Sequence, residues 1–333
     1  MRVLKLVLVA AGMVLALPVS VTIGLAVWLF AAPPATELSE YHPFRSPQAK
    51  TQFLDLYEAM ERDWPVVSEL RMVSTSRGRT FVRVTGPEGA PPLVLLHGAG
   101  GSSLQWAPNV EALSRRCRTF AVDVLGDFGR SVYARPIESA DEYVGWLDEL
   151  FDALELGDGI NLVGLSYGGW IASQYALRHQ ERVDGVVLLA PAGTVLPLSD
   201  GWTGRAILAA LPHRYFTQRL MYWLLEDLAQ GSDSGRALLD EWIDTGFLAV
   251  ATYKPRRMVP PSVLTDAEWQ RITAPVLFLV GEHEKIYPAE RAVERLGRVA
   301  PHVQTEILPG AGHDLSVVRA ELVNQKILEF LAP

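Results

Sequence analysis

The sequence predicts an α/β fold in which a mostly parallel sheet carries helices on both faces. Two additions are expected, a helical insertion and an apolar N-terminal segment. Three observations support this prediction. Short apolar runs alternate with helical patterns along most of the chain, residues 194–273 contain no convincing buried strand, and residues 6–32 contain no charge. Of 333 residues, 49% are hydrophobic and 20% are charged, which excludes a disordered chain.

The N-terminal segment is long enough to cross a bilayer. Residues 6–32 are mostly Leu, Val and Ala, and a membrane-spanning helix needs about 20 apolar residues. Arg2 and Lys5 precede the segment and Glu37 follows it, so the positive-inside rule places the N-terminus in the cytoplasm. We expect residues 1–36 to be a single-pass transmembrane anchor with the remainder outside. The alternatives are a cleaved signal segment, which gives a secreted protein, and a buried core helix.

Residues 37–67 are expected to form a polar linker followed by a helix over residues 48–64, where apolar side chains recur with helical spacing. Strand-like runs come next, and the middle ones are continuously apolar, as in parallel strands buried on both faces. The eight expected strands are 70–73, 80–84, 93–96, 119–122, 160–163, 186–190, 276–280 and 303–308.

Helical patterns separate many of these strands, which predicts a layered core made of residues 68–193 and 274–333. Residues 194–273 are expected to form a helical cap between the two parts. Its aromatic residues either form the cap's own core or face a substrate. The expected core helices are 141–156, 170–179, 290–299 and 315–331, and the cap helices include 206–211, 219–228 and 236–243. The cap aromatics are Trp202, Tyr215, Phe216, Tyr222, Trp223, Trp242, Phe247 and Tyr253.

Four motifs stand at the ends of expected strands. Residues 164–168, GLSYG, match the G-x-S-x-G pattern, whose glycines allow a sharp strand-to-helix turn that exposes the hydroxyl of Ser166. The glycine loop 97–101, HGAGG, is able to aim a backbone N–H at an oxyanion. Residues 281–284, GEHE, place carboxylates after a later strand, and residues 310–313, GAGH, end in His313. The chain order is serine, acid, histidine.

Together with residues 106–109 (WAPN), 123–131 (DVLGDFGRS) and 143–146 (YVGW), these motifs resemble the α/β hydrolase superfamily, in its serine carboxylesterase-like branch. The resemblance covers roughly residues 68–332. It implies an eight-stranded, mostly parallel sheet with helices on both faces.

The resemblance also implies roles for individual residues. Ser166 is the expected nucleophile and His313 the general base. The backbone amides of Ala99 and Tyr167 are the expected oxyanion donors, with Gly100 as a possible substitute for Ala99.

The acid departs from the usual pattern. The family usually has Asp three residues after the glycine of this loop, where the chain has Glu284. Glu is an accepted triad acid, although its extra methylene requires the loop to retract. Glu282 and Asp200 are the alternatives, and Glu282 would have to reach further.

Other polar residues are expected to be structural. His97 is expected to orient its glycine loop, Asp123 and Asp127 to fix the loop that contains them, and the single cysteine, Cys117, to be inert. His283 lacks spaced partner ligands, so we expect no metal, and no cofactor is implied.

These features predict a serine hydrolase that cleaves carboxylic esters through an acyl-enzyme on Ser166. The expected substrate is a small-molecule ester with an apolar acyl or alcohol group, for which a medium chain is the first hypothesis. The net charge of −8 argues against a nucleic-acid partner.

Other activities of the same fold are alternatives. A serine as the nucleophile in the strand-to-helix turn argues against epoxide hydrolases and haloalkane dehalogenases. The same triad also serves C–C hydrolases, haloperoxidases and acyltransferases, and a non-catalytic binding protein is a less favoured reading. Arginines for a substrate carboxylate are available at Arg205, Arg214, Arg219, Arg256 and Arg257.

Overall fold

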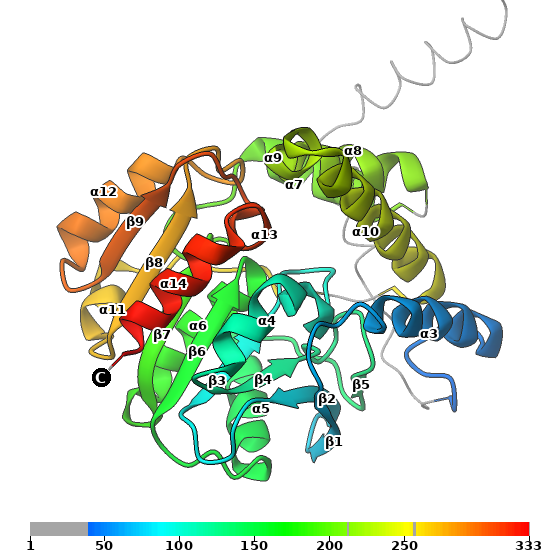
Figure 1. The fold of residues 1–333 in the computed structure, drawn as a ribbon, viewed down its shortest axis with the longest axis horizontal. Coiled ribbons are helices and arrows are strands. Elements are labelled where there is room, and N and C mark those ends of the chain that lie inside the picture. Colours follow the sequence, from blue (N-terminus) through cyan, green and yellow to red (C-terminus); the bar gives the residue numbers. More distant parts are fainter. Residues whose placement is uncertain (1–38, 212, 256–257, 333) are drawn as a thin grey trace, which may run out of the picture.

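The computed structural model describes residues 39–211, 213–255 and 258–332 (Figure 1). The segment predicted to cross a membrane lies outside these residues. In the part of the chain that is described, no helix combines the length and the apolarity needed to span a bilayer. The anchor therefore remains a prediction from the sequence.

One sheet forms the centre of the molecule. Among the described residues its strand order is β1-β2-β4-β3-β6-β7-β8-β9, and β5 pairs with β2. β4, β3, β6, β7, β8 and β9 run parallel, whereas β2 runs antiparallel to β1, β4 and β5. The predicted mostly parallel sheet is confirmed. The bounds are β1 Glu69–Thr75, β2 Gly78–Thr85, β3 Pro92–Leu96, β4 Arg118–Val122, β5 Val132–Tyr133, β6 Ile160–Leu165, β7 Val183–Leu189, β8 Val276–Gly281 and β9 Gln304–Leu308.

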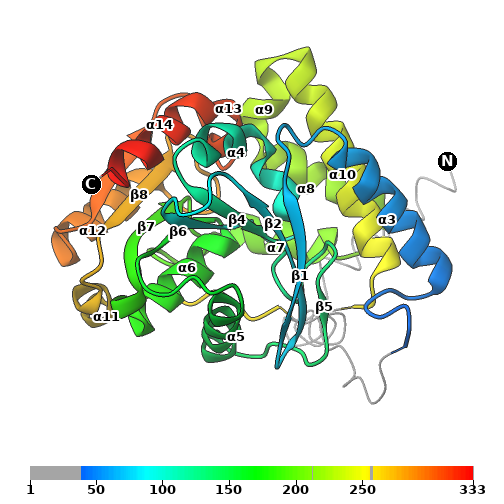
Figure 2. The ribbon, with the colours of Figure 1, turned by 60° about the horizontal axis from the view of Figure 1, so that its bottom comes forward.

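Helices cover both faces of the sheet (Figures 1 and 2). Because side chains alternate along a strand, Leu93 and Leu95 pack on one face, and Val94 and Leu96 pack on the other. The first face is covered by α4 (Ala107–Ser114), α13 (Leu315–Val318) and α14 (Ala320–Phe330). The second is covered by α5 (Ala140–Ala153), α6 (Tyr167–Arg178), α11 (Asp266–Arg271) and α12 (Ala289–Val299). Two 3₁₀ helices are η1 (Ser103–Trp106) and η2 (Gln180–Arg182).

The sheet and the C-terminal helix each differ from the sequence expectation in one respect. The two-residue strand β5 was not predicted, because it is too short to show a periodic pattern. The single helix expected over 315–331 is broken between α13 and α14 at Arg319, which leaves helical geometry with φ −125° and ψ 34°. The Arg319 side chain donates to the carbonyl oxygen of Pro309, so the break ties this helix pair to the loop that precedes His313.

The residues between β7 and β8 are helical. α7 (Asp200–Ala209), α8 (Arg214–Leu224), α9 (Glu226–Gly231) and α10 (Asp233–Thr252) form the unit that we call the cap, at one end of the sheet in Figure 1. Serine side chains accept first-turn N–H groups at its helix starts, Ser199 before α7 and Ser232 before α10. Helix α11 lies within the range predicted as the cap but belongs to the core, because Trp269 is buried among the side chains on the second face of the sheet.

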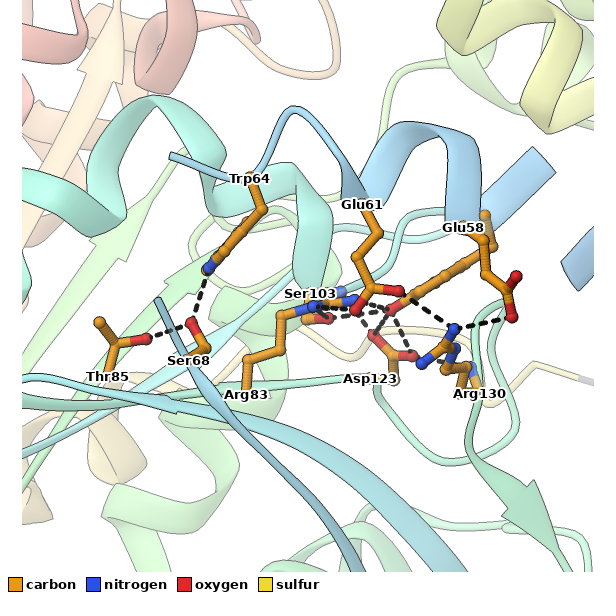
Figure 3. A network of polar contacts seen from close by, with 10 residues as sticks. Glu58, Glu61, Trp64, Ser68, Arg83, Thr85, Ser103, Asp123 and Arg130 are labelled. Carbon is orange, nitrogen blue, oxygen red and sulfur yellow. Dashed lines mark hydrogen bonds and ion pairs between the residues drawn. The ribbon is translucent and has the colours of Figure 1, made fainter. Parts of the chain in front are cut away.

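Helix α3 (Pro47–Glu61) precedes the sheet and packs beside α10 (Figure 2). The rings of Phe53 and Tyr253 meet edge to face, with centroids 4.9 Å apart. A polar network joins α3 to β2, where the buried Arg83 donates to Glu61 at 2.7 Å (Figure 3). Arg83 also donates to the Tyr57 hydroxyl at 3.1 Å. The helix is therefore fixed between the sheet and the cap.

Candidate functional site

Ser166 stands in a strained turn between β6 and α6. Its φ of 52° and ψ of −114° lie outside the regions that non-glycine residues usually occupy. The flanking glycines are required by contact, since a Cβ on Gly164 would lie 2.3 Å from the carbonyl oxygen of Gly168. A Cβ on Gly168 would lie 2.1 Å from that of Leu96. The Ser166 side chain is half-buried at the carboxyl end of its strand.

His313 and Glu284 form a buried pair at the same edge of the sheet. The Nδ1–H of His313 donates to Oε2 of Glu284 at 2.9 Å, and the Glu284 side chain is 0% exposed. The other oxygen, Oε1, accepts the backbone N–H groups of Lys285 at 2.8 Å and Ile286 at 2.9 Å. The longer glutamate chain thus folds back onto its own loop, and three hydrogen bonds hold the carboxylate in place.

The Glu284 carboxylate determines the protonation of His313. Burial disfavours the charged imidazolium, but the charge of Glu284, its hydrogen bond and the charge of Asp314 together raise the pKa of His313. The hydrogen bond also assigns the proton to Nδ1, which leaves Nε2 as the basic nitrogen of the neutral ring.

The other two candidate acids lie elsewhere. Glu282 is exposed, and its Oε2 accepts the backbone N–H of Gly310 at 3.0 Å. Asp200 is exposed in the first turn of α7. Of these three candidate acids, Glu284 is therefore the one whose carboxylate contacts His313.

Ser166, Glu284 and His313 follow β6, β8 and β9, whose carboxyl ends lie at one edge of the sheet. The described contacts do not include a hydrogen bond between Ser166 Oγ and His313 Nε2. Contacts of this kind commonly tighten only when a substrate is bound.

The glycine loop 97–101 lies against Ser166. A Cβ on Gly98 would come within 3.3 Å of the Ser166 Cβ. The N–H of Gly100 is committed to the Asp127 carboxylate at 3.0 Å, whereas in the described part of the chain the N–H of Ala99 has no partner. The N–H of Tyr167 is in the first turn of α6, where amides point out of the helix end.

Residues that the sequence predicted to be structural hold these loops. His97 Nε2 accepts the N–H of Val124 at 2.9 Å, and its Nδ1–H donates to the carbonyl of Gly98 at 2.8 Å. Asp123 accepts the N–H groups of Ser103 and Arg130, both at 2.7 Å. Cys117 is buried, and burial raises the pKa of its thiol.

The short cap helix α9 contacts both loops that carry the Glu284–His313 pair. Glu226 pairs with Lys285, and Asp227 accepts from His283 Nδ1 at 2.9 Å, which raises the pKa of His283. The Asp314 carboxylate accepts the N–H of Leu228 at 2.7 Å. Burial raises the pKa of Asp314, and its backbone hydrogen bonds oppose that shift. These contacts were not foreseen, because nothing in the local sequence pairs α9 with residues 55 to 90 positions away.

An apolar cavity of about 220 Å³ opens beside the glycine loop. Loop residues Ala99 to Gly101 form one side, and α3, α8 and α10 form the others. The contribution of α3 was missed, because the sequence placed this helix in a linker region. A larger depression of about 660 Å³ under α9 is lined by none of the glycine loop residues. Neither space is lined by Ser166, Glu284 or His313, but the apolar cavity includes Ala99 of the glycine loop that lies against Ser166, so we take it as the candidate substrate cavity. The helical walls include Phe53, Tyr57, Met60, Thr217, Leu220, Met221, Trp242, Thr245 and Ala249.

Comparisons with known proteins agree with this geometry. Residues 91–320 match the model of the alpha/beta hydrolase fold family. The chain is 35% identical over 291 residues to carboxylesterase YbfK of Bacillus subtilis, covering 86% of this chain and 96% of that protein. The crystal structure of YbfK superposes with a TM-score of 0.78, at 34% identity, over 86% of this chain and 99% of that one. The crystal structure of naproxen esterase from Bacillus subtilis gives a TM-score of 0.79, at 31% identity, over 89% and 100%. The predicted resemblance is confirmed, and the chain belongs to the α/β hydrolase fold family.

Proposed function

We propose that this protein is a serine hydrolase that cleaves carboxylic esters at Ser166. The observation that carries the proposal is the buried Glu284–His313 pair, which lies at the same sheet edge as a serine in a strained turn. Such a pair supplies the oriented base that a serine nucleophile needs. The carboxylesterases at 31% to 35% identity support ester substrates for this chain.

In the proposed reaction, Ser166 Oγ attacks the ester carbonyl while His313 Nε2 takes the hydroxyl proton. The Glu284 carboxylate stabilises the imidazolium and holds its tautomer. The N–H groups of Ala99 and Tyr167 bind the oxyanion, and one such donor typically contributes about 2.7–4 kcal/mol. His313 then protonates the departing alcohol. Water activated by the same histidine releases the acid from Ser166.

The composition of the cavity favours an ester substrate over the charged dienoate substrate that a C–C hydrolase would bind. Among the described lining residues none is charged, so no cation is placed to bind a substrate carboxylate. Three of the arginines available for that task are engaged elsewhere. Arg205 stacks on Trp223, Arg214 pairs with Asp244 and Arg219 stacks on Tyr215. Arg256 and Arg257 lie outside the described residues.

Active-site labelling tests the proposal. A fluorophosphonate probe is expected to label Ser166, and p-nitrophenyl esters are expected to be hydrolysed by the wild type. Ser166→Ala should lose labelling and nearly all turnover. Labelling of another residue, or equal turnover by Ser166→Ala, would show that the assignment is wrong.

We further propose the placement of the enzyme and its units. Residues 1–36 anchor the chain in a membrane with residues 37–333 outside, and residues 194–273, apart from α11, are the cap inserted into the core. The long uncharged segment preceded by Arg2 and Lys5 supports this orientation. Full-length protein should stay in membranes washed with alkaline carbonate, whereas protein lacking residues 1–36 should not. A mature N-terminus found beyond residue 30 in a soluble fraction would instead establish a cleaved signal.

A further inference from the structure

Strand β1 is an edge of the sheet, and no strand of the described chain pairs with its outer side (Figure 1). Its inner side pairs with β2 in an unbroken antiparallel register, from Glu69 opposite Val84 to Thr75 opposite Gly78. Edge strands are commonly protected by short length, a bulge or a proline. All seven described residues of β1 pair without a bulge, and none of them is proline. The strand is therefore open to pairing on its outer side.

The backbone groups on that outer side belong to alternate residues. Met72 stands opposite Phe81, whose N–H donates to Ser131 Oγ. The carbonyl oxygen of Phe81 accepts the N–H of Asp123, so both backbone groups of Phe81 point away from β1. Met72 and Phe81 therefore form a non-hydrogen-bonded pair, and the N–H and C=O of Met72 face outward. By the same alternation, those of Leu70 face outward as well.

Exposed apolar side chains lie along the same edge. Leu70 is 47% exposed and Met72 is 45% exposed, and Val67, two positions before the strand, is 97% exposed. These are three of the five large apolar side chains that are exposed among the described residues. Leu70 and Met72 are two positions apart, so their side chains lie on one face of the sheet. An apolar row beside unpaired backbone groups is typical of a protein contact.

Two charges select the partner and the register. Glu69 and Arg71 flank Leu70 on the other face of the strand, where they form an ion pair at 2.8 Å. If an antiparallel second copy is centred on Leu70, each Glu69 stands opposite the second copy's Arg71. The outward backbone groups of the two Leu70 residues then also pair with each other.

The other registers fail one of these two conditions. Centring the pair on Arg71 places like charges opposite each other, which is destabilising. Centring it on Met72 leaves Glu69 and Arg71 without an opposite charge. A centre between two residues brings outward backbone groups of one copy against inward groups of the other, so the ladder does not form. The strand is therefore complementary to itself in one register.

We propose that the chain forms a two-fold symmetric dimer by antiparallel β1–β1 pairing centred on Leu70. Such a contact buries the same surface on both copies and joins their sheets into one. Met72 stands opposite Ser68 of the second copy, so the exposed Leu70 and Met72 side chains of both copies form one apolar cluster. The dimer is independent of the ester hydrolase function, because β1 carries none of the three proposed catalytic residues.

Charge exchange tests the partner and the register. The molar mass of the full-length chain in mild detergent is measured by light scattering, and the wild type is expected as a dimer at micromolar concentration. Glu69→Arg and Arg71→Glu each place like charges opposite each other, so each should weaken dimerisation about tenfold or more. The double variant restores opposite charges and should dimerise like the wild type. A mixture of the two single variants should form a heterodimer, because every cross-strand pair then joins opposite charges.

Cross-linking tests the centre of the register. Leu70→Cys places two thiols on residues whose Cα atoms are about 5.5 Å apart, within the disulfide range. Met72→Cys is the matched control, because Met72 is equally exposed but its two copies lie about 14 Å apart. Cys117 is buried and common to both variants. Under mild oxidation, Leu70→Cys should form covalent dimers and Met72→Cys far fewer.

Three outcomes overturn the proposal. They are a wild-type chain that stays monomeric at micromolar concentration, single charge variants that dimerise like the wild type, and equal cross-linking of the two cysteine variants. Thermal unfolding of every variant shows that a lost dimer is not a lost fold.

Discussion

The carboxylate of Asp314 accepts the backbone N–H of Leu228 across a distance of 2.7 Å. The residue after His313 is therefore hydrogen-bonded to the cap. Its second oxygen accepts the N–H of Gly312 at 3.2 Å, so one buried carboxylate organises the His313 loop and seats α9 on it.

Replacing Asp314 should damage both stability and activity. Asp314→Ala leaves two N–H groups without their acceptor, and each such loss costs about 1–3 kcal/mol. We expect the free energy of unfolding to fall by about 2–4 kcal/mol in urea titrations, with a lower kcat/KM. Asp314→Asn keeps an acceptor oxygen and should lose less. An Ala variant as stable as the wild type would contradict the importance of this contact.

Replacing Glu284 should move the pH dependence of activity. Wild-type kcat/KM should rise with pH through an ionisation above the usual histidine value of 6.5, because the proposed base acts when neutral and Glu284 favours the charged form. Glu284→Gln removes the carboxylate charge and leaves burial, the largest contribution, opposed by the charge of Asp314, so the ionisation should move below 6.5.

The same substitution should lower kcat by roughly 10³- to 10⁴-fold, because the tautomer of His313 is no longer held. Glu284→Asp, which keeps the charge, should retain the high ionisation while losing part of the rate. Full pH–rate profiles check both variants. If the apparent pKa on the acid side of the pH–rate profile is the same in Glu284→Gln as in the wild type, a group other than His313 determines it.

Adding a methyl group at Gly98 should impair catalysis more than folding. The new Cβ would lie 3.3 Å from the Ser166 Cβ, a tight contact, so the loop or Ser166 must give by a few tenths of an ångström. We expect Gly98→Ala to lower kcat/KM by roughly 10- to 100-fold, since small displacements of reacting groups have effects of this size. Esterase kinetics and thermal unfolding are measured together.

Gly297→Ala on α12 is the matched control, because its Cβ would meet open space. It should keep full activity and gain up to about 1 kcal/mol of stability from better helix propensity. Equal activity of the two variants would contradict the assigned position of the loop.

Removing the buried Arg83 should loosen the wall of the cavity that α3 provides. Arg83→Met removes the guanidinium that contacts the Tyr57 hydroxyl and leaves Glu61 paired with Arg130 alone, at 3.1 Å. We therefore expect a loss of stability below the about 3–5 kcal/mol that an unpaired buried charge costs. KM should rise more than kcat falls, since α3 lines the cavity and carries none of the proposed catalytic groups.

Arg115→Met, at the residue that follows α4, removes an exposed pair with Glu111 and should change stability by less than about 1 kcal/mol. Urea unfolding and Michaelis–Menten kinetics distinguish the two variants. A similar small effect for Arg83→Met would show that the network does not hold α3.

The sequence alone predicted the sheet and most of its helices, because strands such as Ile160–Leu165 are continuous apolar runs and the helices have their own period. It also located Ser166, since a turn between strand and helix needs glycines at fixed neighbouring positions. The break at Arg319 escaped prediction, because it depends on a side-chain contact with Pro309, ten residues away.

The sequence by itself determined the elements and the strand ends from which the candidate site is built, because these depend on neighbouring residues. Only the tertiary structure decided which glutamate meets His313, that Asp127 engages Gly100 and leaves the Ala99 amide open, and that α3 walls the cavity. The physical reason is distance along the chain. These contacts join segments tens of residues apart, and only packing decides which polar groups become partners.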